Sequence, residues 1–206
     1  MKTEPKKILT LAAHTDDVEI GCAATLHKFK NADIKVIAFS LAPGEDVTHE
    51  FKNSMDILKS SWTRKGTVEY DLYEMEMREL GYNRQKILDI LYEESSSTNY
   101  DLVTCPSSFD THQDHKVIRE ECFRAFKKTT IFGYEMPWNN RKFESDVFVE
   151  VSESDLKNKL KHFDCYKSQA NRSFFSEEYI RSMATYRGFQ CGVQYAEAFE
   201  LIRMVI

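Results

Sequence analysis

Two short segments of the chain combine imidazole and carboxylate side chains at spacings that suit metal-assisted hydrolysis. They are residues 14–17 (HTDD) and residues 110–115 (DTHQDH). Together they hold three histidines and four aspartates, which are typical ligands of a catalytic zinc ion. Zinc in a protein site lowers the pKa of water to about 7, so that hydroxide becomes available as a nucleophile near neutral pH.

Attack on a carbonyl group also needs a base for the water proton and a donor or cation for the oxyanion. The adjacent Asp16 and Asp17 can divide these roles, one as a metal ligand and the other as a free base. In an extended loop, neighbouring side chains point to opposite sides, so we expect only one of these carboxylates to reach the metal. Asp114 has a simpler alternative role, because an aspartate at that position can cap the helix that follows.

Each motif follows an apolar run that predicts a strand buried in a parallel sheet. The runs are residues 8–13 and residues 101–105. Open parallel sheets bind their ligands at the carboxyl ends of the strands, so both motifs are expected at one edge of one sheet. This placement favours a shared metal site over two unrelated loops.

The rest of the chain alternates strand and helix signals. Further strands are predicted at residues 34–39, 67–70, 130–134 and 146–151, and helices at 22–29, 49–58, 84–94, 114–127 and around 156–163. Residues 93–98 (EESSST) indicate a loop, and the aromatic-rich segment beyond residue 163 is expected to be helical or irregular. The alternation predicts an α/β fold, with a mostly parallel sheet and helices on both faces, as a single domain over residues 1–206.

The composition argues against several other classes of protein. Of the 206 residues, 42% are hydrophobic and 30% are charged, which is usual for a globular domain. The formal net charge is −5, so the chain lacks the basic surface that nucleic-acid binding requires. No apolar run approaches the ~18–20 residues that span a bilayer, and the charged start of the chain shows no signal-peptide pattern. These features predict a cytoplasmic protein with no membrane span and no nucleic-acid partner.

The cysteines and the other histidines are weaker candidates for chemistry. The five cysteines form no CxxC pair, so we expect reduced and mostly buried thiols. His27, His49 and His162 lie in predicted helices without neighbouring ligands and are expected on helix surfaces.

Both motifs and several later segments resemble the PIG-L/LmbE-like deacetylase superfamily. Residues 13–21 (AHTDDVEIG) resemble its AHPDD…G motif, and residues 110–115 resemble its DxHxDH motif. Later matches are Gly44-Glu45 for a GE loop, residues 166–169 (YKSQ) for a YxSQ element, and Arg187-Gly188 with residues 195–199 (YAEAF) for an RG…AEaF segment. The resemblance implies a Rossmann-like fold and zinc-dependent removal of acetyl groups, mainly from N-acetylglucosamine-type sugars and their conjugates.

The resemblance also implies a metal site in this chain. The ligands would be His14, Asp17 and His115. Zinc is the expected metal, and Fe²⁺ is the alternative for a site of two histidines and one aspartate.

Three further residues receive catalytic roles from the same resemblance. Asp16 would be the general base. His112 would be the imidazolium that stabilises the oxyanion or protonates the leaving amine. Asp114 would hydrogen bond to His112 or to a ligand histidine and so orient it.

The chain departs from the family pattern where substrate is bound. Thr15 replaces the usual proline of the first motif, and its hydroxyl can hydrogen bond locally in a looser loop. Many relatives carry an arginine after the GE loop, where this chain has residues 47–50 (VTHE). Arg78 or Arg84 could take the place of that arginine from a neighbouring loop.

The segment after the fifth predicted strand offers further substrate contacts. Trp138 could stack on a sugar ring while Asn139 and Arg141 bind hydroxyl groups. The alternative is that Trp138 packs into the aromatic-rich part of the chain. Two other functions stay open as well: hydrolysis of another bond, such as a phosphoester, and a non-catalytic protein that holds a metal and binds sugars.

Overall fold

The computed structural model describes residues 4–62 and 66–205 and places seven strands in one sheet of order β3-β2-β1-β4-β5-β7-β6. Strands β1 to β5 are parallel, and β7 runs antiparallel to both β5 and β6. The strands are β1 Lys7–His14, β2 Asp33–Ser40, β3 Val68–Met75, β4 Leu102–Pro106, β5 Thr130–Tyr134, β6 Val147–Glu150 and β7 Ala196–Arg203. The predicted α/β fold with a mostly parallel sheet is confirmed.

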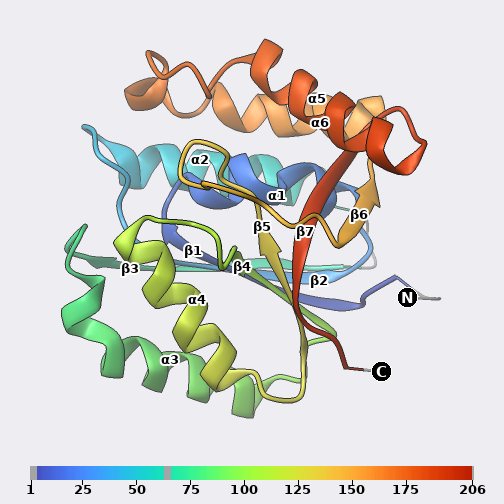
Figure 1. Cartoon of the computed structure of the whole chain (residues 1–206). Helices are drawn as coiled ribbons and strands as arrows, with labels where there is room; N and C mark the ends of the chain where they lie inside the picture. The colour runs from blue at the N-terminus through green and yellow to red at the C-terminus, as the bar shows by residue number, and fades with distance from the viewer. Residues whose placement is uncertain (1–3, 63–65, 206) are drawn as a thin grey trace.

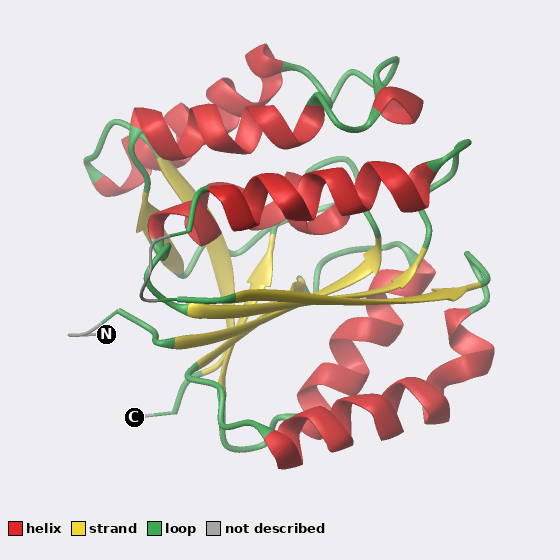
Figure 2. Ribbon diagram, turned by 180° about the vertical axis from the view of Figure 1, so that it is seen from behind, coloured by secondary structure: helices red, strands yellow, loops and turns green. Residues whose placement is uncertain are grey.

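Helices cover both faces of the sheet (Figure 1). Four lie on one face: α1 Asp17–Lys28, α2 Val47–Ser60, α5 Glu153–Phe163 and α6 Glu177–Cys191. Two lie on the other: α3 Arg84–Ser97 and α4 Gln113–Ala125, seen below the sheet in Figure 2. Short 3₁₀ turns, η1 Leu80–Asn83 and η2 Lys167–Gln169, precede α3 and follow α5. No helix in the described ranges is long and apolar enough to cross a membrane.

The sheet separates two hydrophobic layers. One layer, which includes Phe51, Tyr134 and Phe199, fills the space under α1, α2 and α5. The other, which includes Leu11 and Ile118, lies under α3 and α4. β1 is buried on both faces, as its continuous apolar sequence predicts.

Two local predictions were wrong. Residues 93–97 continue α3, and the hydroxyls of Ser95, Ser96 and Ser97 donate to carbonyls of the preceding turn, which keeps these polar side chains compatible with a helix. Strand β7 was not predicted, because charged residues interrupt its apolar pattern. One of them, Glu197, is nevertheless buried and pairs with Lys159 of α5.

Gly21 allows α1 to approach the sheet closely. A Cβ atom on Gly21 would lie 2.4 Å from Cδ2 of Tyr134, whose ring is fully buried and whose hydroxyl donates to the Leu11 carbonyl. Gly21→Ala is therefore expected to lower the free energy of unfolding by about 1–3 kcal/mol through overpacking, although alanine usually stabilises a helix. Urea denaturation measures the difference. Gly81→Ala is the matched control, because nothing lies within 4 Å of its Cβ position; equal stability of the two variants would contradict this account.

Candidate active site

Both predicted motifs meet at the carboxyl edge of the sheet. His14 is the last residue of β1, and α1 begins three residues later at Asp17. β4 pairs with β1. The second motif, residues 110–115, begins shortly after the end of β4 and runs into the first turn of α4. A cavity of about 150 Å³ lies at this edge, and residues lining it include His14, Asp16, Asp17, His112 and His115.

Two imidazole nitrogens and the two carboxylate oxygens of Asp17 converge at this cavity. His14 Nδ1 lies 3.2 Å from His115 Nε2, which lies 3.3 Å from Asp17 Oδ1. The third separation, between His14 Nδ1 and Asp17 Oδ2, is 3.7 Å. Ligand atoms of a tetrahedral zinc ion lie about 3.3 Å apart, since each bond is about 2.0–2.1 Å long. The donor set therefore has the spacing that such an ion requires.

Carboxylates orient both histidines toward the same point. Asp114 Oδ2 lies 3.1 Å from His14 Nε2, and Asp110 Oδ2 lies 2.6 Å from His115 Nδ1. Metal-binding histidines commonly donate their second ring N–H to a carboxylate in this way, which leaves the other nitrogen free for the metal. The family resemblance implied such a role for Asp114 but none for Asp110, although Asp110 opens the second motif.

The charges around the two histidines favour a cation between them. Burial lowers the histidine pKa values, but the facing carboxylates outweigh it, so the pKa rises to about 9 for His14 and about 10 for His115. Despite its own burial, the pKa of Asp17 lies well below its usual range, because His115 and His14 stabilise the carboxylate. A divalent cation supplies positive charge at the same place.

Asp16 differs from Asp17 in having no such partner. Its backbone is helical (φ −107°, ψ −7°) at the N-cap position of α1, where its side chain forms no capping hydrogen bond, so the expectation of an extended loop was wrong. Within the described part of the chain no side chain hydrogen bonds to the Asp16 carboxylate, which lines the cavity. Burial and the charge of Asp17 raise the pKa of Asp16 to about 6, a value that suits a general base.

His112 caps α4 in place of Asp114. Its Nδ1 accepts a hydrogen bond from the backbone N–H of Asp114 at 3.2 Å, which leaves Nε2 to donate into the cavity. Burial and the neighbouring His115 and His14 lower the pKa of His112. Both observations favour a neutral, hydrogen-bond-donating His112 over the imidazolium that the family resemblance implied. With His14 and His115, His112 also forms a group whose ligand atoms lie within 4.8 Å of one another and could hold a metal.

A buried hydrogen-bond network supports the loop that carries Asp16. The Tyr166 hydroxyl donates to the Thr15 carbonyl and lies 2.8 Å from Glu19 Oε1. Glu19 also accepts from Ser54, which lies 2.7 Å from Nδ1 of His162. The network ties the first motif to α2 and α5.

Two histidines of this region are not on helix surfaces, contrary to expectation. His162 and His27 are each 1% exposed, with 2.8 Å between their Nε2 atoms. His49 is exposed, as expected. Burial lowers the pKa of His27 to about 4 and that of His162 well below its usual range, so both are neutral structural groups.

Removing the Tyr166 hydroxyl should loosen the loop without touching the metal ligands. Tyr166→Phe is expected to lower kcat about 10- to 100-fold while the bound metal stays at the wild-type level, because a small misplacement of a catalytic group has an effect of this size. Steady-state kinetics and metal analysis measure both quantities. Tyr82→Phe is the matched control, since Tyr82 is 91% exposed; an unchanged kcat in Tyr166→Phe would rule out this support role.

Residues 166–169 (YKSQ) hold the loop between β2 and α2 in place. Ser168 donates from its backbone N–H and its hydroxyl to Glu50 of α2, and Gln169 donates to the Pro43 carbonyl. Thr15 contributes as well, because its hydroxyl oxygen accepts a hydrogen bond from the Ala42 N–H at 3.0 Å. The local bond expected for this replacement of proline thus joins the first motif to the loop after β2.

The predicted substrate residues divide into two groups. Arg78, Trp138 and Asn139 line the cavity. Arg84 does not, because it pairs with Glu120 and Glu121 of α4. Arg141 is exposed and lies outside the lining.

Two further residues line the cavity without having been predicted as site residues. Phe174 stacks on Trp138 with 3.8 Å between ring centroids and 12° between the planes. Trp138 therefore packs against the aromatic-rich segment, as one prediction had it, and also lines the cavity, where the other prediction placed it. Arg172 precedes Phe174 and lines the same cavity. No local pattern marks Arg172, since it reaches the site only through the fold of the η2–α6 connection.

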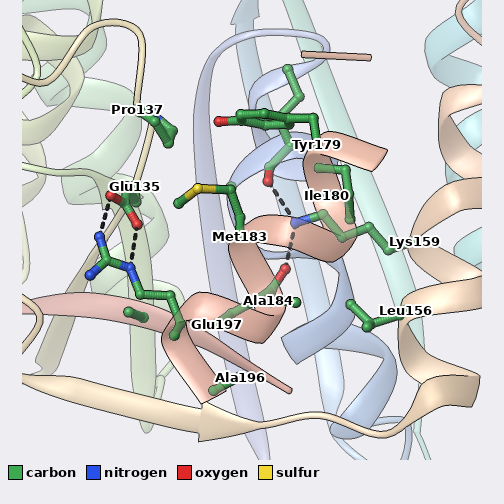
Figure 3. A pocket seen from close by; sticks show the side chains of 14 residues that line it. Glu135, Pro137, Leu156, Lys159, Tyr179, Ile180, Met183, Ala184, Ala196 and Glu197 are labelled. Atoms are coloured by element: carbon green, nitrogen blue, oxygen red, sulfur yellow. Dashed lines mark hydrogen bonds and ion pairs between the residues drawn. The ribbon is translucent and has the colours of Figure 1, made fainter. Parts of the chain in front are cut away.

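A second cavity lies between α1, α5, α6 and β7 (Figure 3). Its charged groups are already paired. Lys159 Nζ donates to Glu197 and to the Ile20 carbonyl, each at 2.6 Å, and Arg187 forms two hydrogen bonds with Glu135. These ion pairs fasten α6 and β7 to the rest of the molecule.

Comparisons with known proteins agree with this geometry. The PIG-L family model, described as GlcNAc-PI de-N-acetylase, matches residues 9–126, more than half of the chain. The uncharacterized deacetylase YaiS of Escherichia coli K12 is 26% identical over 172 residues, which cover 79% of this chain and 91% of YaiS.

Two solved structures share the fold. N,N'-diacetylchitobiose deacetylase from Pyrococcus horikoshii superimposes with a TM-score of 0.67 at 18% identity, covering 97% of this chain and 84% of that chain. GalB, the 4-carboxy-2-hydroxymuconate hydratase of Pseudomonas putida KT2440, gives a TM-score of 0.77 at 16% identity, covering 98% of both chains. At these identities the likeness shows a common architecture, whereas the family match rests on the sequence itself. The chain belongs to the PIG-L family of GlcNAc-PI de-N-acetylase-like proteins.

Proposed function

We propose that this protein is a metal-dependent hydrolase that removes the acetyl group from an N-acetylated sugar or sugar conjugate. The observation that carries the proposal is the convergence of His14 Nδ1, His115 Nε2 and an Asp17 oxygen beside the unpaired Asp16 carboxylate. Family membership and the deacetylase YaiS support amide hydrolysis as the reaction.

The metal ligands in this proposal are His14, Asp17 and His115. Asp17 is preferred to His112 as the third ligand, because its oxygens lie within 3.7 Å of both histidine nitrogens and His112 is engaged in capping α4. Zinc is the expected metal, with Fe²⁺ as the alternative. When bound, the metal supplies a Lewis acid that polarises the substrate carbonyl and lowers the pKa of water.

The chain's own side chains supply the proton transfers. Asp16 takes the proton of the attacking water, for which its position in the cavity and raised pKa suit it. His112 donates a hydrogen bond from Nε2 to the oxygen that gains negative charge. The proton held by Asp16 then passes to the leaving amine, so acetate and a free amino sugar are the products.

The residues around the site suit the binding of a sugar. The stacked pair of Trp138 and Phe174 presents an aromatic surface at the cavity, and the Asn139 side chain offers amide groups beside it.

The unpaired cysteines, three of them buried, suit the reducing conditions of the cytoplasm, where we expect the protein to work.

A panel of substrates tests the reaction type. Metal-loaded protein is incubated with N-acetylglucosamine, an N-acetylglucosamine disaccharide and an aryl phosphate, and acetate, amine and phosphate are measured. We expect acetate and amine in equal amounts from the acetylated sugars. Phosphate release alone would favour a phosphoesterase, and no product from any compound would favour a binding protein without catalysis.

A further inference from the structure

Two buried histidines lie at one end of the hydrogen-bond network behind the catalytic loop. His27, in the last turn of α1, has its Nε2 atom 2.8 Å from Nε2 of His162 in α5. His162 Nδ1 lies 2.7 Å from Ser54 Oγ in α2, and Ser54 donates to Glu19 Oε1 at 2.5 Å. Each of these four side chains is at most 1% exposed. In such a buried chain each hydrogen bond polarises the next, so the bonds strengthen one another.

The other end of the network meets the residue before the proposed general base. Tyr166 Oη lies 2.8 Å from the same Glu19 oxygen, and its hydroxyl donates to the Thr15 carbonyl. Thr15 is fully buried and directly precedes Asp16 in the chain. Glu19 and His27 are eight residues apart in α1, so the network extends about 12 Å along this helix. It therefore joins the last turn of α1 to the loop that carries Asp16.

The arrangement of donors indicates which ring nitrogens carry protons. Ser54 and Tyr166 both direct their hydroxyls at Glu19 Oε1, so this oxygen acts as an acceptor. Because Ser54 has a single hydroxyl proton, its oxygen accepts on the other side, and His162 donates from Nδ1. Burial lowers the pKa of His162 well below its usual range, so the ring is neutral and its Nε2 carries no proton. That nitrogen accepts from the Nε2–H of His27.

The opposite direction of donation would end less favourably at His27. Its Nδ1 has no hydrogen-bond partner among the residues that the structure describes. In the direction derived above this nitrogen carries no proton, because burial lowers the pKa of His27 to about 4 and the ring is neutral. In the reverse direction it would be a buried N–H without an acceptor, and orphaned donors are rarer than under-satisfied acceptors. The N–H at His162 Nδ1 is thus the group that directs Ser54 toward Glu19.

We propose that His162 is a positioning residue for Asp16: its Nδ1–H orients Ser54 and, through that hydroxyl, the rest of the network. This inference rests on the proposed deacetylase function, in which Asp16 is the base. The competing explanation is that His162 only packs α5 against α1 and α2. In that case its replacement would lower stability and leave the turnover of folded, metal-loaded protein unchanged.

Two replacements of His162 separate these explanations. The amide N–H of asparagine can take the place of Nδ1–H, whereas the longer glutamine carries its amide near the position of Nε2. His162→Asn should therefore keep the bond to Ser54 and a kcat close to that of the wild type. His162→Gln should lower kcat about tenfold, the size expected for a slightly misplaced catalytic group, while KM and bound zinc stay unchanged.

The kinetic test uses the metal-loaded protein and an N-acetylglucosamine disaccharide, at a temperature where urea denaturation shows each variant to be folded. His49→Gln, at an exposed position in the same chain, is the control that should match the wild type. A wild-type kcat in His162→Gln would overturn the inference. Equal losses of kcat in His162→Asn and His162→Gln would overturn it as well, because the conservative variant must restore turnover.

NMR of the wild-type protein tests the direction of donation without any substitution. The ring nitrogen shifts should show a protonated Nδ1 and a bare Nε2 in His162, and the reverse in His27; the opposite tautomers would overturn the inference.

Hydrogen exchange of residues 14–20 decides the inference independently of turnover. It should be faster in His162→Gln than in His162→Asn, and equal exchange in the two variants would contradict the positioning role. Absence of acetate release by the wild-type protein would count against the proposed function instead.

Discussion

Asp16→Asn is expected to lower kcat by about 10²–10⁴-fold while the protein keeps its metal, which is the usual effect of removing a general base. Asparagine preserves the size and shape of the side chain but cannot take up the water proton. The Asp16 carboxylate lines the cavity and accepts no hydrogen bond from any described side chain, so little else should change. Turnover of one acetylated sugar and zinc titration of the same preparation measure the two quantities.

Asp17→Asn is the matched comparison on the adjacent residue. Its carboxylate lies 3.3 Å from His115 Nε2 and accepts from the His14 backbone N–H, so we expect this variant to lose metal affinity first. A neutral amide is a poorer ligand than a carboxylate. If Asp16→Asn loses zinc while Asp17→Asn keeps it, the two roles are reversed. Wild-type turnover of Asp16→Asn would exclude it as the base.

His115→Ala should remove metal and activity together. His115 is 2% exposed and is held by Asp110, with Nε2 aimed at the point shared by His14 and Asp17. Loss of a ligand should exceed the 10- to 100-fold loss of affinity typical when a supporting group is removed, so we expect a decrease of at least about 100-fold.

The control for His115→Ala is His49→Ala, an exposed histidine away from the cavity. It should keep wild-type affinity and turnover. Metal titration at limiting zinc, with acetate release measured on the same samples, makes the comparison. Full occupancy of His115→Ala under those conditions would contradict its assignment as a ligand.

The sequence predicts the sheet edge well because its signals there are local. The apolar run of residues 8–13 identifies β1, and His14 follows that run as the last residue of the strand. Pairing of β1 with β4 then brings the second motif beside the first. Strand β7 escaped prediction because Glu197 looks exposed in sequence. Its partners when buried are Lys159, 38 residues away, and the backbone N–H groups of Ala24 and Thr25 in α1.

The finer roles in the site depend on contacts that no local pattern encodes. Asp114 and His112 are both able to cap a helix, and the path of the backbone into α4 decides for His112. The approach of Arg172 to the first motif depends on how the η2–α6 connection crosses the edge of the sheet. Tyr166 is visible as a motif residue, but its bond to the Thr15 carbonyl spans 151 residues. Long-range packing sets the positions of Arg172 and Tyr166.

Metal-dependent acetate release tests the central claim most directly. Purified protein is analysed for metal, and acetate release from an N-acetylated sugar is followed before chelation, after chelation and after zinc is restored. We predict one metal ion per chain, loss of acetate release on chelation, and its return with zinc. Undiminished acetate release by metal-free protein, or a protein that cannot rebind zinc, would contradict the proposal that His14, Asp17 and His115 form the catalytic metal site.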